Sequence, residues 1–145
     1  MGMYTAHIGT AKIKPEYYGL VRGMLRAQRD FYHRKYPALR EELEVAYPCY
    51  AELACTDRWD CLFYWMTGDS HMDWGKLENP TTFKDGVLSW GGCFKNYDGE
   101  IDKFANLLET ISTSFSLQDW YEEEEAPRTY LGKGAWTAHS YRWGM

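Results

Sequence analysis

The spacing of hydrophobic and polar residues in the N-terminal part predicts a strand followed by a helix. Residues 4–14 alternate between apolar or β-branched and polar side chains, which is the period of a strand. Pro15 and Glu16 then favour a helix start, because proline suits the first turn and an acid suits the positive end of the helix dipole. From there to about Lys35, apolar side chains recur on one side of a helical wheel, and Pro37 ends the pattern.

The middle of the chain, residues 38–85, is less regular and is interpreted as an insert-like crossover. A second helix is predicted over residues 38–46, before Pro48. Residues 49–66 fit a helix, and residues 62–66 fit a strand equally well. Polar residues with glycine and proline then predict a loop-rich stretch, in which Trp74 is expected to be exposed on a binding loop.

The C-terminal part returns to clear periods. Residues 87–94 predict a strand, in which Gly91 and Gly92 indicate a bulge or a close backbone approach. An acid-rich start at residues 96–100 and apolar residues at helical spacing predict a helix that ends at residues 112–114. Residues 115–121 and 130–143 predict two further strands, joined as a hairpin.

The order of these elements predicts the fold class. The predicted elements follow one another as strand, helical insert, strand, helix and two strands. This is the order of an α+β protein with a ferredoxin-like split βαβ core. Such a core is an antiparallel sheet with two main helices, here with an enlarged helical and loop-rich first crossover. A chain of 145 residues without an internal repeat or linker predicts a single domain over residues 1–145.

Composition excludes several classes of protein. Hydrophobic residues make up 45% and aromatic residues 17% of the chain, which excludes a disordered protein. The apolar runs are too short for a membrane helix and the N-terminus has no export signal, so a cytoplasmic protein that does not contact a membrane is expected. The cysteines lack CxxC spacing and the histidines are scattered, which predicts reduced thiols and neither a metal site nor a cofactor.

The charge is unevenly distributed along the chain. Net charge is −5, but residues 1–40 hold eight Lys or Arg against two acids, so that 8 − 2 = +6 there and 8 − 19 = −11 in residues 41–145. This asymmetry predicts either a basic and an acidic face, each able to attract a charged partner, or two halves that neutralise each other in the fold.

The acidic candidate surface lies near the predicted hairpin. Alternate glutamates of a strand share a side, so consecutive ones can form a row of carboxylates that mimics nucleic acid and binds a basic groove. The alternative is an edge strand that charge protects from aggregation. Together with the loop tryptophan, the expected partner-binding residues are Asp119, Glu122, Glu123, Glu124, Glu125 and Trp74.

The basic candidate surface is the polar side of the first long helix, formed by Arg22, Arg26, Arg29 and His33. Cations on one helix face can track phosphates, which predicts nucleic-acid binding. The alternative is a solvated helix face, since the sequence pI of about 5.4 is far from that of most nucleic-acid binders.

A third candidate is a small hydrolase site in the irregular stretch. Carboxylates and a histidine can act as general acid and base, and the residues in question are Asp57, Asp60, Asp69, His71 and Asp73. Their spacing is unspecific, and the chain has no GxSxG, P-loop or GxGxxG motif, so no catalytic residue is assigned and an enzyme is not expected.

Residues 85–109, DGVLSWGGCFKNYDGEIDKFANLLE, and the later segment YEEEEAPRTY carry a resemblance to other proteins. They resemble a group of small uncharacterised proteins of bacteriophages and integrated elements, in which a Lys-Asn-Tyr-Asp turn precedes an acid-rich helix and a Tyr-Glu-Glu strand. The opening YTAHIGTAKIKPEYY is similar to their first strand and helix. The resemblance implies a mobile element in a bacterial host, where short proteins bind and block machinery such as restriction or CRISPR effectors.

These observations lead to one expected function and two alternatives. The expected function is a non-catalytic binding protein that inhibits a host protein or nucleoprotein complex, and exposed tryptophans also allow a homodimer. The first alternative is a small nucleic-acid-binding module that uses the basic helix face, and the second is the hydrolase.

Overall fold

The computed structural model describes residues 5–29, 37–63, 81–121 and 127–137. Their strands are β1 (Thr5–Ile13), β2 (Thr82–Lys84), β3 (Val87–Phe94), β4 (Ser112–Tyr121), β5 (Arg128–Gly132) and β6 (Ala135–Trp136). Their helices are α1 (Tyr18–Arg29), α2 (Pro37–Ala46), α3 (Ala51–Ala54) and α4 (Glu100–Ile111), with single 3-10 turns at Pro15–Tyr17, Pro48–Tyr50 and Trp59–Cys61.

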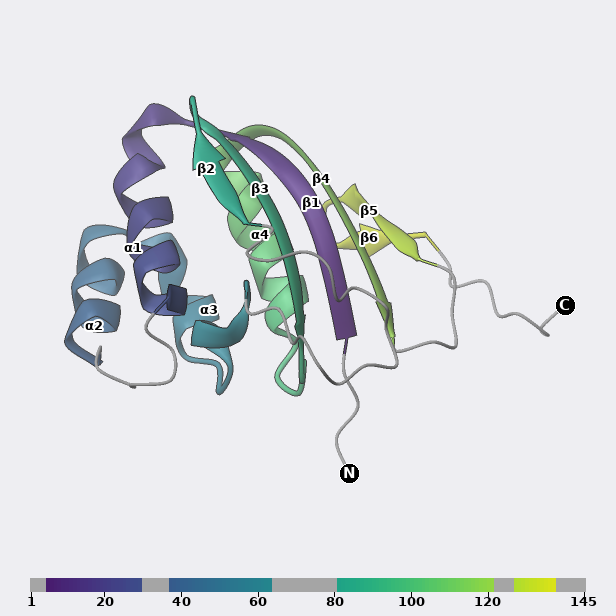
Figure 1. Ribbon diagram of the computed structural model, residues 1–145, viewed down its shortest axis with the longest axis horizontal. Helices are drawn as coiled ribbons and strands as arrows, with labels where there is room; N and C mark the ends of the chain where they lie inside the picture. The colour runs from purple at the N-terminus through teal and green to yellow at the C-terminus, as the bar shows by residue number, and fades with distance from the viewer. Residues whose placement is uncertain (1–4, 30–36, 64–80, 122–126, 138–145) are drawn as a thin grey trace, which may run out of the picture.

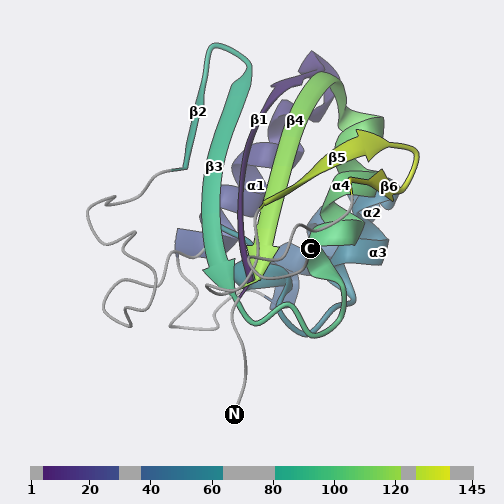
Figure 2. The same ribbon diagram turned by 90° about the vertical axis from the view of Figure 1, so that its right-hand side faces the viewer.

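The strands form one antiparallel sheet in the order β2-β3-β1-β4-β5-β6. β1 is central and pairs with β3 on one side and β4 on the other. In the view of Figure 1, α4 lies behind the sheet while α1 and α2 lie to its left, and the turned view shows β5 and β6 bending away from β4 over α4 (Figure 2). The α+β class predicted from the sequence is therefore confirmed.

The core lies between the helices and the facing side of the sheet. Phe104 of α4 packs edge-on against Trp90 of β3 and against His7 of β1, with ring centroids 5.1 and 6.0 Å apart. A Cβ atom at Gly92 would collide with the carbonyl oxygen of Leu62. The close approach predicted for the glycine pair is thus confirmed, whereas the predicted alternative of a bulge is wrong because β3 keeps an unbroken register with β1.

Two glycines bring α1 and α2 together. A Cβ atom at Gly23 would lie 2.5 Å from Cδ2 of Leu43, and one at Gly19 would meet the hydroxyl of Tyr47. Leu20 and Val21 of α1 are buried, as the helical wheel predicted. The basic helix α1 and α2, which contains three glutamates, are therefore neighbours (Figure 1).

The structure corrects the predicted elements in three places. β2 lies inside residues 38–85, which the sequence suggested to be a helical and loop-rich crossover: Asp85 and Gly86 have φ of 53° and 77° and form the tight turn of a β2–β3 hairpin. Residues 130–143 are not one strand, because the turn at residues 132–134 separates β5 from β6. The helix α4 ends at Ile111, as predicted, but β4 begins directly at Ser112 and not at residue 115.

The uncertain stretch at residues 49–66 consists of short helical segments and turns where the structure describes it. It contains a 3-10 turn, α3 and a second 3-10 turn, and Leu62 and Phe63 are not in a strand. Residues 64–66 lie outside the described residues. Among the helices described, none has the length and apolar character needed to cross a membrane.

Candidate functional site

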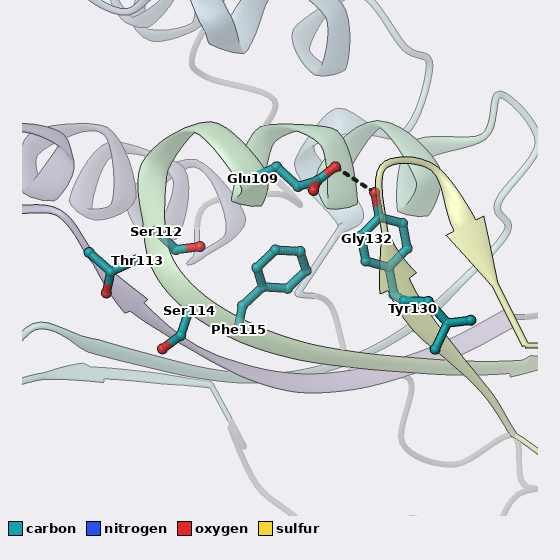
Figure 3. A pocket seen from close by; sticks show the side chains of 8 residues that line it. Glu109, Ser112, Thr113, Ser114, Phe115, Tyr130 and Gly132 are labelled. Carbon is teal, nitrogen blue, oxygen red and sulfur yellow. Dashed lines mark hydrogen bonds between the residues drawn. The ribbon is translucent and has the colours of Figure 1, made fainter.

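A pocket lies in the fork where β5 separates from β4. In the part of the chain that the structure describes, the two strands pair at Gln118 with Thr129 and at Asp119 with Arg128, and β5 then bends toward α4 (Figure 2). The space enclosed by α4, β4 and β5 has a volume of about 350 Å³. We call it the fork pocket, and its lining residues are Glu109, Ser112, Thr113, Ser114, Phe115, Tyr130, Leu131 and Gly132 (Figure 3).

A carboxylate and a phenol stand at one end of the fork pocket. The hydroxyl of Tyr130 donates to Oε2 of Glu109 at 2.7 Å, and the backbone N–H of Lys133 donates to the same carboxylate at 3.1 Å. The hydrogen bonds from Tyr130 and Lys133 lower the pKa of Glu109, whereas burial is the main cause that raises the pKa of Tyr130. At neutral pH, Glu109 is therefore ionised and Tyr130 is protonated.

The remaining walls combine aromatic rings and small hydroxyls. The rings of Phe115 and Tyr130 are stacked, with centroids 5.6 Å apart and planes 25° from parallel. Figure 3 shows Phe115 and Ser112 pointing into the space beneath α4, while Thr113 and Ser114 point away from it. The hydroxyl of Ser112 donates to the carbonyl of Leu108 at 2.5 Å, so it satisfies an acceptor at the end of α4.

An ion pair holds the opposite end of the fork closed. Arg128 makes two hydrogen bonds to Asp119, of 2.6 and 3.0 Å, and its guanidinium lies 3.9 Å from the ring centroid of Trp136. The indole N–H of Trp136 donates in turn to Asp102 of α4 at 3.0 Å. The prediction that Asp119 belongs to an exposed carboxylate row is wrong: its residue is only 2% exposed, because β4 turns it toward the helices and Arg128 binds it.

The sheet side opposite the helices presents polar residues of four strands, and we call it the open face. The register aligns Thr82, Ser89, Thr10 and Ser116 in one row across β2, β3, β1 and β4. The adjoining row contains Lys84, Val87, Lys12 and Ser114. Among the described residues of β1 to β4, no acid points to this side, so the open face is basic.

The predicted basic helix face is described only in part. Arg22 and Arg26 are exposed on α1, and the guanidinium of Arg22 lies 5.7 Å from the ring centroid of Tyr18 and 5.8 Å from that of Phe83. Arg29 ends α1, but its side chain and all of His33 lie outside the described residues.

The other predicted site residues are mostly outside the described part of the chain. Trp74 and Glu122, Glu123, Glu124 and Glu125 lie outside it, and so do Asp69, His71, Asp73 and the side chain of Asp60. Asp57 is exposed, and its N–H donates to Asp98. Within the described residues, no group of three or more His, Cys, Asp or Glu could hold a metal ion, and all four cysteines are free thiols.

Sequence reasoning missed two fully buried polar side chains. Glu100 is 0% exposed and accepts hydrogen bonds from the N–H groups of Arg58 (2.9 Å) and Asp98 (3.0 Å), so it ties the loop after α3 to the start of α4. His7 is also 0% exposed: it accepts from the indole N–H of Trp90 at 3.1 Å and pairs through Nε2 with the carbonyl of Leu62 at 2.7 Å. No sequence motif marks either residue.

The two partners of His7 determine its protonation. Nδ1 must be the acceptor for the indole N–H, and Nε2 must carry the proton that is donated to the Leu62 carbonyl, so the ring is neutral. Burial lowers its pKa from 6.5 to about 4. A ring that is enclosed and has both nitrogens occupied belongs to the core and is not an accessible general base.

Comparison of the chain with protein-family models, with curated proteins and with solved structures found no match.

Proposed function

We propose that this chain is a non-catalytic binding protein of a phage or mobile element, and that it inhibits a host factor that handles nucleic acid. The observation that supports binding is the open face, where four strands present mainly short side chains on the side of the sheet opposite the helices. Serine and threonine lose little rotamer freedom when a partner covers them. A surface of short, mainly polar side chains suits contact with another protein.

The glutamates between β4 and β5, residues 122–125, supply the charge in this proposal, and we call them the acidic connection. They compete with nucleic acid for a basic groove of the host factor, because rows of carboxylates and phosphates attract the same cations. The ion pair of buried Asp119 and half-buried Arg128 joins β4 and β5 close to the ends that the acidic connection links. Asp119 adds no charge to this surface, since Arg128 neutralises it.

Capture of partners from a bacterial lysate tests the proposal. The tagged chain is compared with a variant in which all four glutamates of the acidic connection are glutamine, each with and without nuclease. We expect a protein that wild type captures in the presence of nuclease and that the variant loses, because the amides keep the size and remove the charge. A matched control removes the same charge elsewhere, at the exposed residues Glu16, Glu41, Glu42 and Glu52.

Two results would count against this mechanism. Equal capture by wild type and the acidic-connection variant would show that the charge is not used. Equal loss in both variants would show that only net charge matters and that the position of the glutamates does not.

The open face also favours a second candidate, a nucleic-acid-binding module. Lys12 and Lys84 flank Val87 in one row, and two cations on a surface without a described acid can contact phosphates. Binding of labelled single-stranded DNA should then weaken steeply with salt, and Lys12→Gln with Lys84→Gln should weaken it more than Arg22→Gln on α1. Absence of binding at low salt would end this candidate.

We also propose that β1 to β4 with α1 and α4 are a ferredoxin-like split βαβ core, to which β5 and β6 are added. A helix follows the first and the third strand, and the order β2-β3-β1-β4 supports this arrangement. In this proposal the fork pocket lies outside the core, between it and the added strands.

A further inference from the structure

The edge of β4 that faces the fork is available for pairing over half of its length. β4 has ten residues, and β5 pairs with it at Gln118 and Asp119. Among the described residues, the stretch 112–117 pairs only with β1, so its other edge lacks a neighbouring strand. Such an edge is a template to which an extended peptide can add by backbone hydrogen bonds.

This edge lacks most of the features that keep an exposed strand from pairing with another chain. Proteins usually block sheet edges with lysine, proline, bulges or very short strands. The opposite edge follows this rule, because β2 has three residues and ends in Lys84. Residues 112–117, Ser-Thr-Ser-Phe-Ser-Leu, contain neither a charge nor a proline, and their one irregularity is the register shift opposite Lys12 and Ile13.

The fork pocket beside this edge has the chemistry to hold a cationic side chain. Of the described residues that line it, Glu109 is the one with a charge, and its lowered pKa keeps it ionised. The pocket is also next to the last turn of α4, where the helix dipole is negative. The rings of Phe115 and Tyr130 give the methylene stem of a lysine or arginine an apolar wall.

Two cations of the chain lie close by without filling the pocket. The ammonium of Lys14 donates to the carbonyl of Thr110 at 3.0 Å and so caps α4. Lys133 reaches Glu109 through its backbone N–H, while its exposed side chain adds a weak favourable charge interaction. Neither residue lines the pocket, so the charge of Glu109 remains available to a ligand.

We infer that the fork binds an extended, basic peptide segment of a partner protein, whose backbone pairs with residues 112–117 of β4 and whose lysine or arginine side chain enters the fork pocket. The inference rests on the proposed binding function and names the chemical class of the segment that is bound. It assigns Glu109 as the specificity residue and the β4 edge as the source of backbone pairing.

Titration of the full chain with synthetic peptides, followed by amide NMR, tests this inference. The probe is a blocked six-residue peptide of alternating valine and threonine with one central arginine. We expect saturable shifts at the amides of residues 112–117, and affinity about fivefold lower when citrulline, a neutral arginine analogue, replaces arginine. A peptide with N-methyl groups on the pairing edge should not bind, because it cannot donate to the strand.

Protein variants locate the interaction. Glu109→Gln keeps a hydrogen-bond acceptor for Tyr130. It should lower the affinity for the arginine peptide to that for the citrulline peptide. Glu52→Gln, an exposed glutamate on α3, is the matched control and should bind like wild type. Lys133→Ala should tighten binding, because it removes a competing cation.

The inference is overturned if arginine and citrulline peptides bind equally, if the shifts lie away from β4, or if the two glutamine variants behave alike. The citrulline comparison uses the unaltered protein, so it holds even if Glu109→Gln disturbs the fold. Failure of the fork is distinguishable from failure of the proposed function, because the peptide assay needs no host factor and the capture assay does not depend on Glu109.

Discussion

Acid should destabilise this protein through His7, whose ring is enclosed by the core. The folded chain holds the ring neutral with a pKa of about 4, whereas the unfolded chain has the ordinary value of 6.5. Above pH 6.5 both states are neutral and His7 causes no pH dependence. As the pH falls from 6.5 to 4, only the unfolded state gains the proton, so the free energy of unfolding falls by about 1.4 kcal/mol per pH unit, or about 3 kcal/mol in all.

Urea unfolding of wild type and His7→Gln between pH 7.5 and 4.5 measures this contribution. The glutamine amide has no proton to gain in this range, so the free energy of unfolding of the variant should change less with pH. The variant is less stable than wild type at pH 7.5, because Trp90 or Leu62 loses a hydrogen-bond partner. We expect wild type to lose about 2–3 kcal/mol more than the variant between the two pH values. Other titrating groups cancel in the comparison, and parallel curves for the two proteins would refute the reasoning.

Two further predictions concern stability. Gly92→Ala should lower the free energy of unfolding by about 2–3 kcal/mol, because the added methyl group meets the rigid backbone carbonyl of Leu62. Gly23→Ala should change the free energy of unfolding little, because the added methyl group meets the flexible end of Leu43 and alanine favours a helix. Similar losses of stability in both variants would contradict the argument that the backbone approaches closely at Gly92. Arg128→Lys should cost about 2 kcal/mol in urea unfolding, because a lysine cannot form both hydrogen bonds to buried Asp119 or stack on an indole, and unchanged stability would show that the pair is dispensable.

The elements that the sequence predicted well are those with a long amphipathic period. α1, α4 and β1 each bury one side against the sheet or the helices, so their hydrophobic spacing carries the information. β2 was missed because three residues are too few to show a period. The signal for β2 was the Asp85-Gly86 pair, a common two-residue hairpin turn, but the polar residues before it made this pair look like part of a loop.

The candidate site was harder to predict because it depends on contacts distant in sequence. The position of Asp119 was available from the strand period, since Phe115, Leu117 and Asp119 alternate and share the inner side of β4. The fork pocket was not, because it exists only where β5 leaves β4 to meet α4. Glu109 and Tyr130 are 21 residues apart, and neither belongs to a motif.

The attachment of β5 and β6 has a consequence for local stability. Among the described residues, two residue pairs join β5 to β4, and Tyr130 is the one buried side chain of β5 and β6. Side-chain hydrogen bonds from Arg128, Tyr130 and Trp136 to carboxylates add to this attachment. Segments with few buried apolar contacts open at lower free energy than the global unfolding transition. Amides of residues 128–136 should therefore exchange with deuterium well before those of β1, and a ligand in the fork should slow this exchange, because it binds only while the hairpin is closed.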